Sequence, residues 1–292
     1  MRELNWGRDG RDWPNGTYST FVPCGSITWH VQRMGSGPLI LLLHGTGAST
    51  HSWSELLPKL AETFSVLAID LPGHGFTSAP GKPEASLPGM AAAIAALLTE
   101  LQVQPSFIVG HSAGAAIALQ LNLDRHLTPE AIVSINGALM PFDGPASFLF
   151  PILAKAVSFN PLSARCVAWA ARDERRVRRL IEQTGSSVAN SYVDRYAILL
   201  RTRRHVAGTL SMMANWDLFR LFDRLPDVDV PVQLLVGSRD RAVPPQDAHA
   251  AKERLPRAEL VRLDGLGHLA HEEDADRIAS MITETFAASM AL

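Results

Sequence analysis

The segment Gly-His-Ser-Ala-Gly at 110–114 is the part of this sequence best suited to covalent chemistry. It follows an apolar run at 107–109 that is typical of a buried strand, and it opens an alanine-rich run at 113–123 that is typical of a helix. At such a junction, flanking glycines keep Cβ atoms out of a tight turn and leave the serine hydroxyl beside the positive end of the helix. We therefore predict that Ser112 is a nucleophile. The five-residue pattern alone is a weak signal, so the prediction depends on partners elsewhere in the chain.

A serine is a poor nucleophile near neutral pH, so it needs a base, and the base needs a carboxylate that orients it. His268 follows the last predicted strand, and Asp240 follows the strand before it. Both residues should therefore lie just past the carboxyl ends of strands, where open α/β sheets place their sites. We predict that Ser112, His268 and Asp240 act as nucleophile, base and acid.

Other residues compete for these two supporting roles. His271 is an alternative base, and Asp143 and Asp247 are outside candidates for the acid. Asn136 ends the strand that follows the serine, which is the other place from which an acid can come, but it carries no carboxyl group. Asp240 could instead be an ordinary turn residue that pairs with a flanking arginine.

The negative charge that develops on an attacked carbonyl also needs hydrogen-bond donors. The loop His-Gly-Thr-Gly at 44–47 follows the apolar run at 39–43 and can present a backbone N–H group at that point. The first N–H group of the helix after Ser112 supplies a second donor. We predict an oxyanion hole made by the N–H groups of Thr46 and Ala113; the alternative is an ordinary glycine-rich turn.

Strands and helices alternate along most of the chain. Apolar runs predict strands at 20–22, 27–32, 39–43, 66–69, 107–109, 131–135, 232–236 and 260–263, and helical spacing predicts helices at 53–64, 87–101, 113–123, 246–254 and from about 272. This alternation favours an α/β fold with a doubly wound, mostly parallel sheet. Between 137 and 216 only helical spacing is found, which predicts an inserted helical cap. The expected units are an N-terminal extension at 1–18, a core at 19–137 and 217–292, and the cap at 138–216.

Composition and charge exclude several classes of protein. The chain has 292 residues, of which 47% are hydrophobic and 19% charged, which argues against overall disorder. A formal net charge of -2 lacks the basic footprint of a nucleic-acid-binding protein. No apolar run reaches the roughly 18 residues of a membrane helix, and the N-terminus is polar, so we expect a cytoplasmic protein. Cys24 and Cys166 have no metal or redox spacing, and we expect no metal site and no cofactor.

With the segment Asp-Leu-Pro-Gly-His-Gly at 70–75, these motifs together resemble the α/β-hydrolase superfamily from about Phe21 to the C-terminus. The order Ser112, Asp240, His268 is the order of nucleophile, acid and base in that superfamily. The resemblance implies a serine hydrolase that acts on an ester or related acyl bond of an apolar substrate. Serine at the nucleophile position, in place of aspartate, argues against the haloalkane dehalogenases and epoxide hydrolases of the same fold.

Longer strings at 12–15, 29–33, 44–53, 86–91, 110–116 and 212–218 resemble the magnesium chelatase accessory protein family of bacteriochlorophyll biosynthesis. This resemblance implies a photosynthetic bacterium, a tetrapyrrole intermediate as substrate, and magnesium chelatase subunits as partners. The family name describes a pathway and not a reaction. The alternatives are therefore a non-catalytic porphyrin-binding or magnesium chelatase accessory protein, and an ordinary carboxylesterase with no role in the pathway. Because every catalytic part is present, we favour the enzyme.

The predicted cap is strongly basic. Between Lys155 and Val206 there are eleven Lys or Arg residues against four acidic residues. This segment could present a solvated basic face, hold the carboxylates of a porphyrin through Arg175 and Arg176, or dock onto an anionic membrane surface or an acidic partner. Apolar residues that we expect to be buried in packing are Val177, Leu180 and Ile181 and, further along, Met212, Met213 and Trp216.

Overall fold

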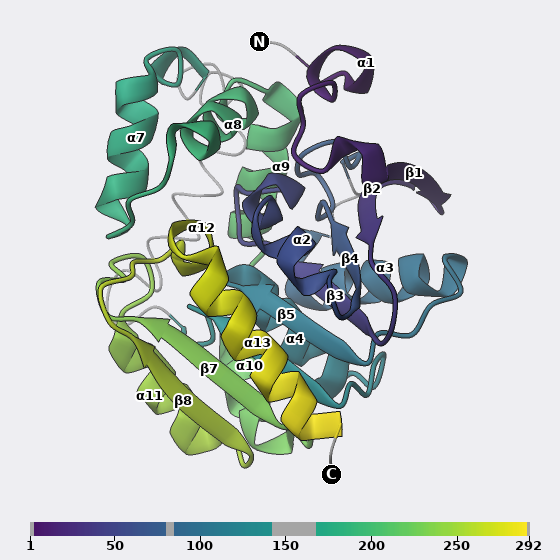
Figure 1. Cartoon of the computed structure of the whole chain (residues 1–292), viewed down its shortest axis with the longest axis vertical. Coiled ribbons are helices and arrows are strands. Elements are labelled where there is room, and N and C mark those ends of the chain that lie inside the picture. Colours follow the sequence, from purple (N-terminus) through teal and green to yellow (C-terminus); the bar gives the residue numbers. More distant parts are fainter. Residues whose placement is uncertain (1–2, 80–84, 142–167, 291–292) are drawn as a thin grey trace.

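The computed structural model describes residues 3–79, 85–141 and 168–290. Asp143, an outside candidate for the acid, lies outside these ranges, as do Cys166 and part of the predicted cap. Eight strands form one sheet with helices on both faces (Figure 1). This is an α/β-hydrolase fold, as the sequence predicts.

The sheet is parallel except at one edge. Its strands, in spatial order, are β1 (Ser19–Cys24), β2 (Ile27–Met34), β4 (Ser65–Ile69), β3 (Leu39–Leu43), β5 (Phe107–His111), β6 (Ala131–Ile135), β7 (Val232–Gly237) and β8 (Ala258–Leu263). β2 pairs antiparallel with both β1 and β4, and the other neighbouring strands are parallel. The carboxyl ends of β3 to β8 therefore meet at one edge, which is where the candidate residues were expected.

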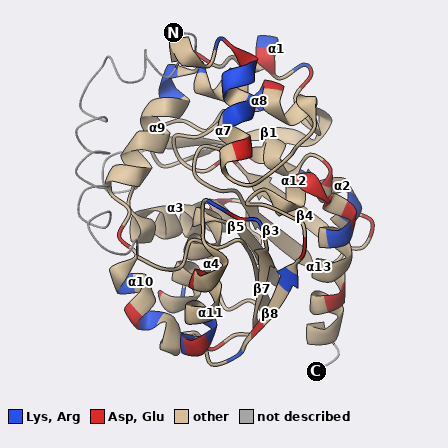
Figure 2. Ribbon diagram, turned by 90° about the vertical axis from the view of Figure 1, so that its left-hand side faces the viewer, with Lys and Arg blue, Asp and Glu red and all other residues tan. Residues whose placement is uncertain are grey.

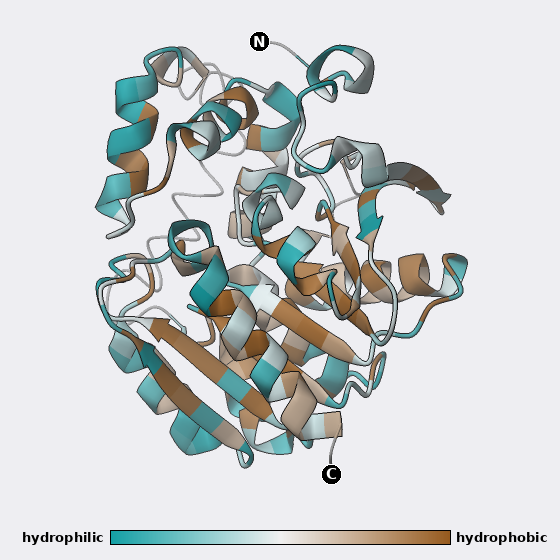
Figure 3. Cartoon of the chain, in the orientation of Figure 1, coloured by the Kyte–Doolittle hydropathy of each residue, from teal (hydrophilic) through white to brown (hydrophobic). Residues whose placement is uncertain are grey.

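The central strands are apolar on both sides because helices cover both faces. In β3, the side chains of Leu41 and Leu43 join one buried cluster, while those of Ile40 and Leu42 join the other. All four are fully buried, and burial of each such side chain contributes about 1.5–3 kcal/mol. Figure 3 shows this hydrophobic centre. Strands β3 to β6 contain no Lys, Arg, Asp or Glu, whereas outer helices such as α10 and α13 carry charged residues (Figure 2).

Two groups of helices form these faces. One face carries α3 (Leu87–Glu100), α4 (Ala113–Leu123), α10 (Phe219–Arg224) and α11 (Pro245–Arg254), and the other carries α2 (Leu56–Leu60) and α13 (Ala275–Met290). The helix predicted at 53–64 is shorter than expected, since a 3-10 turn, η2 (Thr50–Trp53), precedes α2. Ser86 is the N-cap residue of α3, since its hydroxyl accepts a hydrogen bond from the N–H of Gly89 (3.2 Å).

Helices described between β6 and the last two strands lie over the loops at the carboxyl edge. Those in this upper layer are α7 (Glu174–Gln183), α8 (Asn190–Leu200) and α9 (Arg203–Ala214), in the upper part of Figure 1, whereas α10, which also precedes β7, packs on a face of the sheet. A Cβ atom at Gly208 of α9 would lie 2.2 Å from the carbonyl oxygen of Gly73, so this helix packs directly on the loop after β4. In α7, Val177 and Ile181 are buried as predicted, but Leu180 is 52% exposed and does not belong to the buried stripe.

The N-terminal residues pack against this upper layer. They form two short helical turns, α1 (Trp6–Asp9) and η1 (Gly16–Tyr18). Trp13 and Phe76 form an edge-to-face aromatic pair, and both belong to a buried cluster with Leu199 of α8. No helix within the described ranges is long and apolar enough to cross a membrane.

Candidate active site

Ser112 lies in a strained turn between β5 and α4. Its φ is 52° and its ψ is -118°, a combination that non-glycine residues rarely adopt. A Cβ atom at Gly110 would lie 2.5 Å from the backbone of Ala115, and one at Gly114 would lie 2.0 Å from the carbonyl oxygen of Leu43. The two glycines of the motif are therefore needed for close packing around the turn, as the sequence predicts.

Thr46 and Ala113 lie in the wall of the same cavity as Ser112. Ala113 is the first residue of α4, so its N–H group has no partner within the helix. Within the described residues, neither the Thr46 N–H nor the Ala113 N–H donates a hydrogen bond. Glycine at position 45 lets the two loops approach, because a Cβ atom there would lie 3.1 Å from the Cβ of Ser112.

His268 and Asp240 form a direct pair. The Nδ1–H of His268 donates to Oδ2 of Asp240 at 2.7 Å. The other carboxylate oxygen, Oδ1, accepts the backbone N–H groups of Ala242 (2.8 Å) and Val243 (2.9 Å). These donors fix the carboxylate, and the carboxylate fixes the tautomer of the ring, which leaves Nε2 of the neutral imidazole able to accept a proton.

His268 and Ser112 both line this cavity. Within the part of the chain that the structure describes, no hydrogen bond joins Nε2 of His268 to the Ser112 hydroxyl. Such contacts are often long in unliganded sites and shorten when a substrate binds. The structure therefore brings all five predicted site residues to one cavity or its supporting loop.

The main chain of His268 is held by two further side chains. Asn136 donates from Nδ2 to the carbonyl oxygens of Gly267 (2.9 Å) and His268 (2.8 Å), and its Oδ1 accepts the N–H of Gly237 (2.7 Å). Nε2–H of His111 donates to the same His268 carbonyl at 2.9 Å. From the sequence, Asn136 was notable only because it has no carboxyl group, whereas the structure shows that its amide holds the main chain of His268.

The segment that follows α7 also supports the loops of the acid and the base. Gly185 and Gly267 are in direct contact, since a Cβ atom at Gly267 would lie 2.4 Å from the carbonyl carbon of Gly185. The Ser186 hydroxyl accepts the N–H of Leu269 (2.8 Å), and the Thr184 carbonyl accepts the N–H of Arg241 (3.0 Å). No local sequence signal indicates these contacts, because they join residues more than fifty positions apart.

The cavity has a volume of about 420 Å³ and a largely apolar wall. Besides the site residues, its lining includes Ala138, Met140, Pro141, Met213, Trp216, Leu218, Val243 and Pro244. Met212 is fully buried as expected, and Trp216 packs against the core cluster as expected, but Trp216 and Met213 also line this cavity. Apolar residues at helical spacing indicate that one face of a helix is shielded from solvent. The spacing does not show whether that face packs on the core or lines a cavity.

The alternative base His271 lies away from this cavity. It is fully buried, and its Nε2 is 2.9 Å from the Ser52 hydroxyl. Burial lowers the pKa of His271 to about 3, so the ring is neutral near pH 7. The alternative acid Asp247 does line the cavity, but the carboxylate that holds His268 is that of Asp240.

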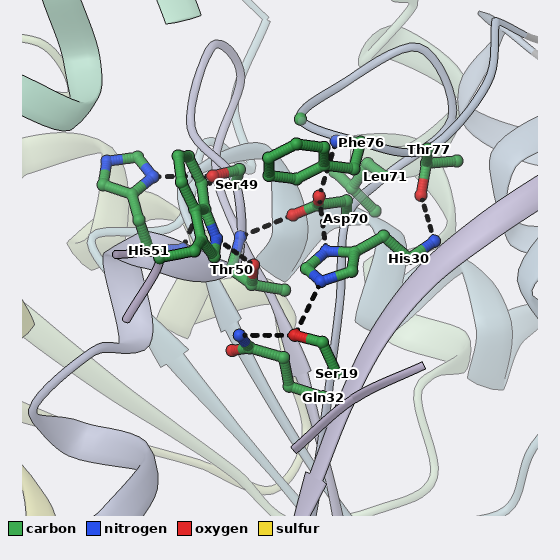
Figure 4. Close-up of polar contacts among 12 residues, drawn as sticks. Ser19, His30, Gln32, Ser49, Thr50, His51, Asp70, Leu71, Phe76 and Thr77 are labelled. Atoms are coloured by element: carbon green, nitrogen blue, oxygen red, sulfur yellow. Dashed lines mark hydrogen bonds and ion pairs between the residues drawn. The ribbon is translucent and has the colours of Figure 1, made fainter. Parts of the chain in front are cut away.

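A second Ser-His-Asp arrangement lies at β1, β2 and the end of β4 (Figure 4). Nδ1 of His30 is 2.8 Å from Oδ2 of Asp70, and its Nε2 is 2.9 Å from the Ser19 hydroxyl. His30 and Asp70 are fully buried, and Asp70 also accepts the N–H groups of Thr50 (2.6 Å) and Phe76 (2.8 Å). Burial alone would raise the pKa of Asp70, but His30, His44 and the N–H of Thr50 hold it well below its usual value. This arrangement fastens the segments that follow β3 and β4, which contain Thr50 and Phe76.

Comparison with known proteins agrees with the fold. Residues 40–281 match the α/β hydrolase family. The magnesium-chelatase 30 kDa subunit of Rhodobacter capsulatus is 40% identical over 94% of this chain and 96% of that protein. The pimeloyl-[acyl-carrier protein] methyl ester esterase of Xanthomonas campestris pv. campestris is 28% identical over 89% of this chain and 99% of that protein. The crystal structure of an α/β hydrolase fold protein from Burkholderia ambifaria superposes with a TM-score of 0.77 at 22% identity, over 91% of this chain and 97% of that one.

The two kinds of match support one conclusion. The family match spans most of the chain, and the 40% identity extends over nearly the full length of both proteins. The solved structure, at 22% identity, adds agreement on the fold alone. The chain belongs to the α/β hydrolase family, in which it is a near full-length relative of the magnesium-chelatase 30 kDa subunit.

Proposed function

We propose that this protein is a serine hydrolase that cleaves an ester or related acyl bond of an apolar substrate. The observation that carries the proposal is the 2.7 Å hydrogen bond between His268 and Asp240, formed beside the cavity that Ser112 also lines. The strained turn at Ser112 supports it, because a backbone at φ 52° persists only where the surrounding structure enforces it.

The proposed reaction begins when Ser112 Oγ attacks the acyl carbon while Nε2 of His268 takes the hydroxyl proton. The N–H groups of Thr46 and Ala113 hold the oxyanion of the tetrahedral intermediate. The C–O bond to the leaving group then breaks, and His268 returns the proton to that alcohol. A water molecule attacks the acyl-enzyme with His268 again as base, and this releases the acid and restores Ser112. Asp240 keeps the imidazole oriented and stabilises its protonated form.

We further propose that residues 138–216 act as a cap over this site, that 1–18 form an N-terminal extension, and that 19–137 and 217–292 form the core. The contact of Gly208 with the loop after β4 supports this division. So do Met213 and Trp216, which bring apolar surface from this segment to the cavity. An apolar wall reduces the access of water to the reacting groups and strengthens their electrostatic interactions.

The proposed substrate is a tetrapyrrole intermediate, and the proposed partner is magnesium chelatase. Both proposals are supported by the 40% identity to the magnesium-chelatase 30 kDa subunit. The relative named as a methyl ester esterase supports cleavage of a carboxylic ester. The alternative is a non-catalytic accessory role, and the following experiment distinguishes it from catalysis.

Covalent labelling with a fluorophosphonate probe tests the proposal. The wild type should be labelled, and Ser112→Ala and His268→Ala should not be, with folding of each variant checked by its thermal transition. Ser19→Ala is the matched control, because it removes the serine of the second Ser-His-Asp arrangement and should leave labelling unchanged. Labelling that persists in Ser112→Ala, or a folded wild type that is never labelled, would contradict the proposed activity.

A further inference from the structure

Arg241 is the residue of the cavity wall that the proposed mechanism leaves without a role. Among the described residues of this wall, the polar side chains are those of Thr46, Ser112 and His268, which have proposed roles, and the charged side chains of Arg241 and Asp247. Asp247 has an interaction of its own in the chain. Within the described residues, the guanidinium of Arg241 forms no hydrogen bond or ion pair, whereas that of Arg239, two residues earlier, pairs with Glu273 at 3.4 Å.

The backbone of Arg241 is fixed relative to the catalytic groups. It follows Asp240 directly, and the next two N–H groups, of Ala242 and Val243, hold the Asp240 carboxylate. Its own N–H donates to the carbonyl oxygen of Thr184 at 3.0 Å. The same short turn therefore orients the base through Asp240 and places Arg241 in the wall of the cavity.

The arginines that the sequence suggested for a carboxylate do not have this placement. The side chain of Arg175 is 88% exposed and pairs with Asp173 at 3.1 Å. Arg176 lies over the ring of Trp169, 5.0 Å from its centroid. Within the described residues, neither of these arginines lines the cavity.

We propose that Arg241 binds a free carboxylate of the substrate, so that the natural substrate is a half-ester with an apolar body, one ester group and one free acid group. This inference rests on the proposed hydrolase function and specifies its substrate class. A guanidinium binds a carboxylate through two parallel N–H donors, which gives orientation as well as attraction. The apolar wall accommodates the body of the substrate while the ester reaches Ser112.

A pair of chromogenic esters tests the proposal. One is a mono-4-nitrophenyl ester of a dicarboxylic acid, and the other is a 4-nitrophenyl ester of a monocarboxylic acid of equal chain length, each made at several lengths. At the best chain length, kcat/KM of the wild type should be about tenfold higher for the charged ester than for the neutral one. This is the lower end of the range for a hydrogen bond to a charged group, because Arg241 is exposed to solvent. The preference should fall as salt is added.

Substitutions then test whether Arg241 causes the preference for the charged ester. Arg241→Gln should bring the ratio of the two kcat/KM values close to one, and Arg241→Lys should retain part of it as a point charge. Arg262→Gln is the matched control, since it removes the same charge from an exposed position on β8 and should leave the ratio unchanged. A wild type without the preference, or a preference that survives in Arg241→Gln, would overturn the role of Arg241 while leaving the hydrolase function intact.

A binding measurement separates failure of the subsite from failure of the enzyme. The ligand is the monomethyl half-ester of a dicarboxylic acid of the preferred length, titrated calorimetrically into Ser112→Ala. Binding should weaken about tenfold in Ser112→Ala/Arg241→Gln relative to Ser112→Ala alone. Equal binding by the two would overturn the subsite. Arginine-dependent binding by a protein that hydrolyses neither ester would support the subsite and contradict the hydrolase function.

Discussion

The side-chain amide of Asn136 donates a 2.8 Å hydrogen bond to the carbonyl oxygen of His268. The oxygen of the same amide accepts the N–H of Gly237, which ends β7, three residues before Asp240. One buried side chain on β6's carboxyl end therefore links the loop of the proposed base to the strand that carries the proposed acid. We infer that Asn136 maintains the spacing of the His268–Asp240 pair.

Substitution of Asn136 should slow the labelling of Ser112 by more than the loss of folded protein explains. In Asn136→Asp, a carboxylate oxygen replaces the amide donor and faces the carbonyl oxygens of Gly267 and His268. Each buried polar group left unpaired costs about 1–3 kcal/mol. The rate of fluorophosphonate labelling of Ser112, measured on the folded fraction, should fall about tenfold or more.

Asn136→Gly is the comparison that separates backbone strain from lost hydrogen bonds. The φ of Asn136 is 47°, which glycine adopts without strain. This variant should therefore also label slowly, because it lacks the same donors. Wild-type labelling rates in both variants would show that Asn136 has no positioning role.

Gly185 should be essential to the placement of both loops. Its φ is 86°, and a Cβ atom there would lie 1.8 Å from the carbonyl oxygen of Arg239, so Gly185→Ala forces the backbone apart. Gly265→Ala is the matched control, because Gly265 has a φ of 82° with no atom near an added Cβ. Gly265→Ala should cost about 1 kcal/mol in the free energy of unfolding. Gly185→Ala should cost clearly more and slow labelling of Ser112; equal effects would contradict the packing argument.

The sheet was predictable because its central strands are buried on both faces. Continuous apolar runs bounded by turn residues mark β3 and β6 at the residues where the structure places them. The tight turn at Ser112 was predictable for a related reason. A serine between a strand and a helix needs glycine nearby on both sides, because larger side chains would clash in the turn. In both cases the physical requirement acts on neighbouring residues, so the sequence alone displays it.

Features that depend on distant contacts were not predictable. Nothing near Asn136 shows that its amide faces the loop at 267–268, and nothing near Gly185 shows that it packs on that loop. Spacing likewise could not show that Trp216 faces a cavity or that Leu180 faces solvent. Arg241 was considered only as a neighbour of Asp240, because its place in the cavity wall depends on the tertiary arrangement of several loops.

The strain at Ser112 should be measurable as stability. Ser112→Ala retains a side chain at φ 52° and ψ -118°, whereas Ser112→Gly relieves the strain. We expect the glycine variant to be more stable than the alanine variant by about 1 kcal/mol in urea unfolding. At Ser280, exposed within α13, the same pair should have the opposite order, because glycine weakens a helix by about 1 kcal/mol relative to alanine. If the alanine variant were the more stable one at both sites, the turn at Ser112 would be unstrained.

His205 should make the protein sensitive to acid. Its Nε2–H donates to the Gly47 carbonyl (3.0 Å), and its Nδ1 accepts the N–H of Gly75 (3.0 Å). Burial lowers the pKa of His205 from 6.5 to about 4. Between these values the unfolded chain binds a proton that the folded chain does not, so stability falls as the pH falls.

The variant His205→Gln isolates this contribution. Its free energy of unfolding should depend on pH less steeply than that of the wild type, by up to about 1.4 kcal/mol per pH unit between pH 6.5 and 4. His249→Gln, at an exposed position on α11, should retain the wild-type slope. A His205→Gln slope equal to that of the wild type would mean that His205 does not resist protonation in the fold.

Glu272 should have the opposite effect, on the alkaline side. It is buried four residues after His268, and its Oε1 accepts hydrogen bonds from the hydroxyl groups of Ser52 and Tyr196. Burial raises the pKa of Glu272 from 4.5 to about 8, although these two donors lower it. The folded chain therefore retains a proton that the unfolded chain releases. The resulting stability is fully present below about pH 4.5 and is lost as the pH rises through about 8.

Glu272→Gln keeps the shape of the side chain and removes its titration. Relative to this variant, the wild type should lose up to about 1.4 kcal/mol of unfolding free energy for each pH unit between 4.5 and 8, measured by urea unfolding at several pH values. Glu284→Gln, at an exposed position on α13, should follow the wild type. Because Tyr196 belongs to α8, the same rise in pH should also destabilise that helix locally, which faster amide hydrogen exchange in α8 would detect. Parallel pH profiles for the wild type and Glu272→Gln would show that Glu272 is already ionised in the folded protein.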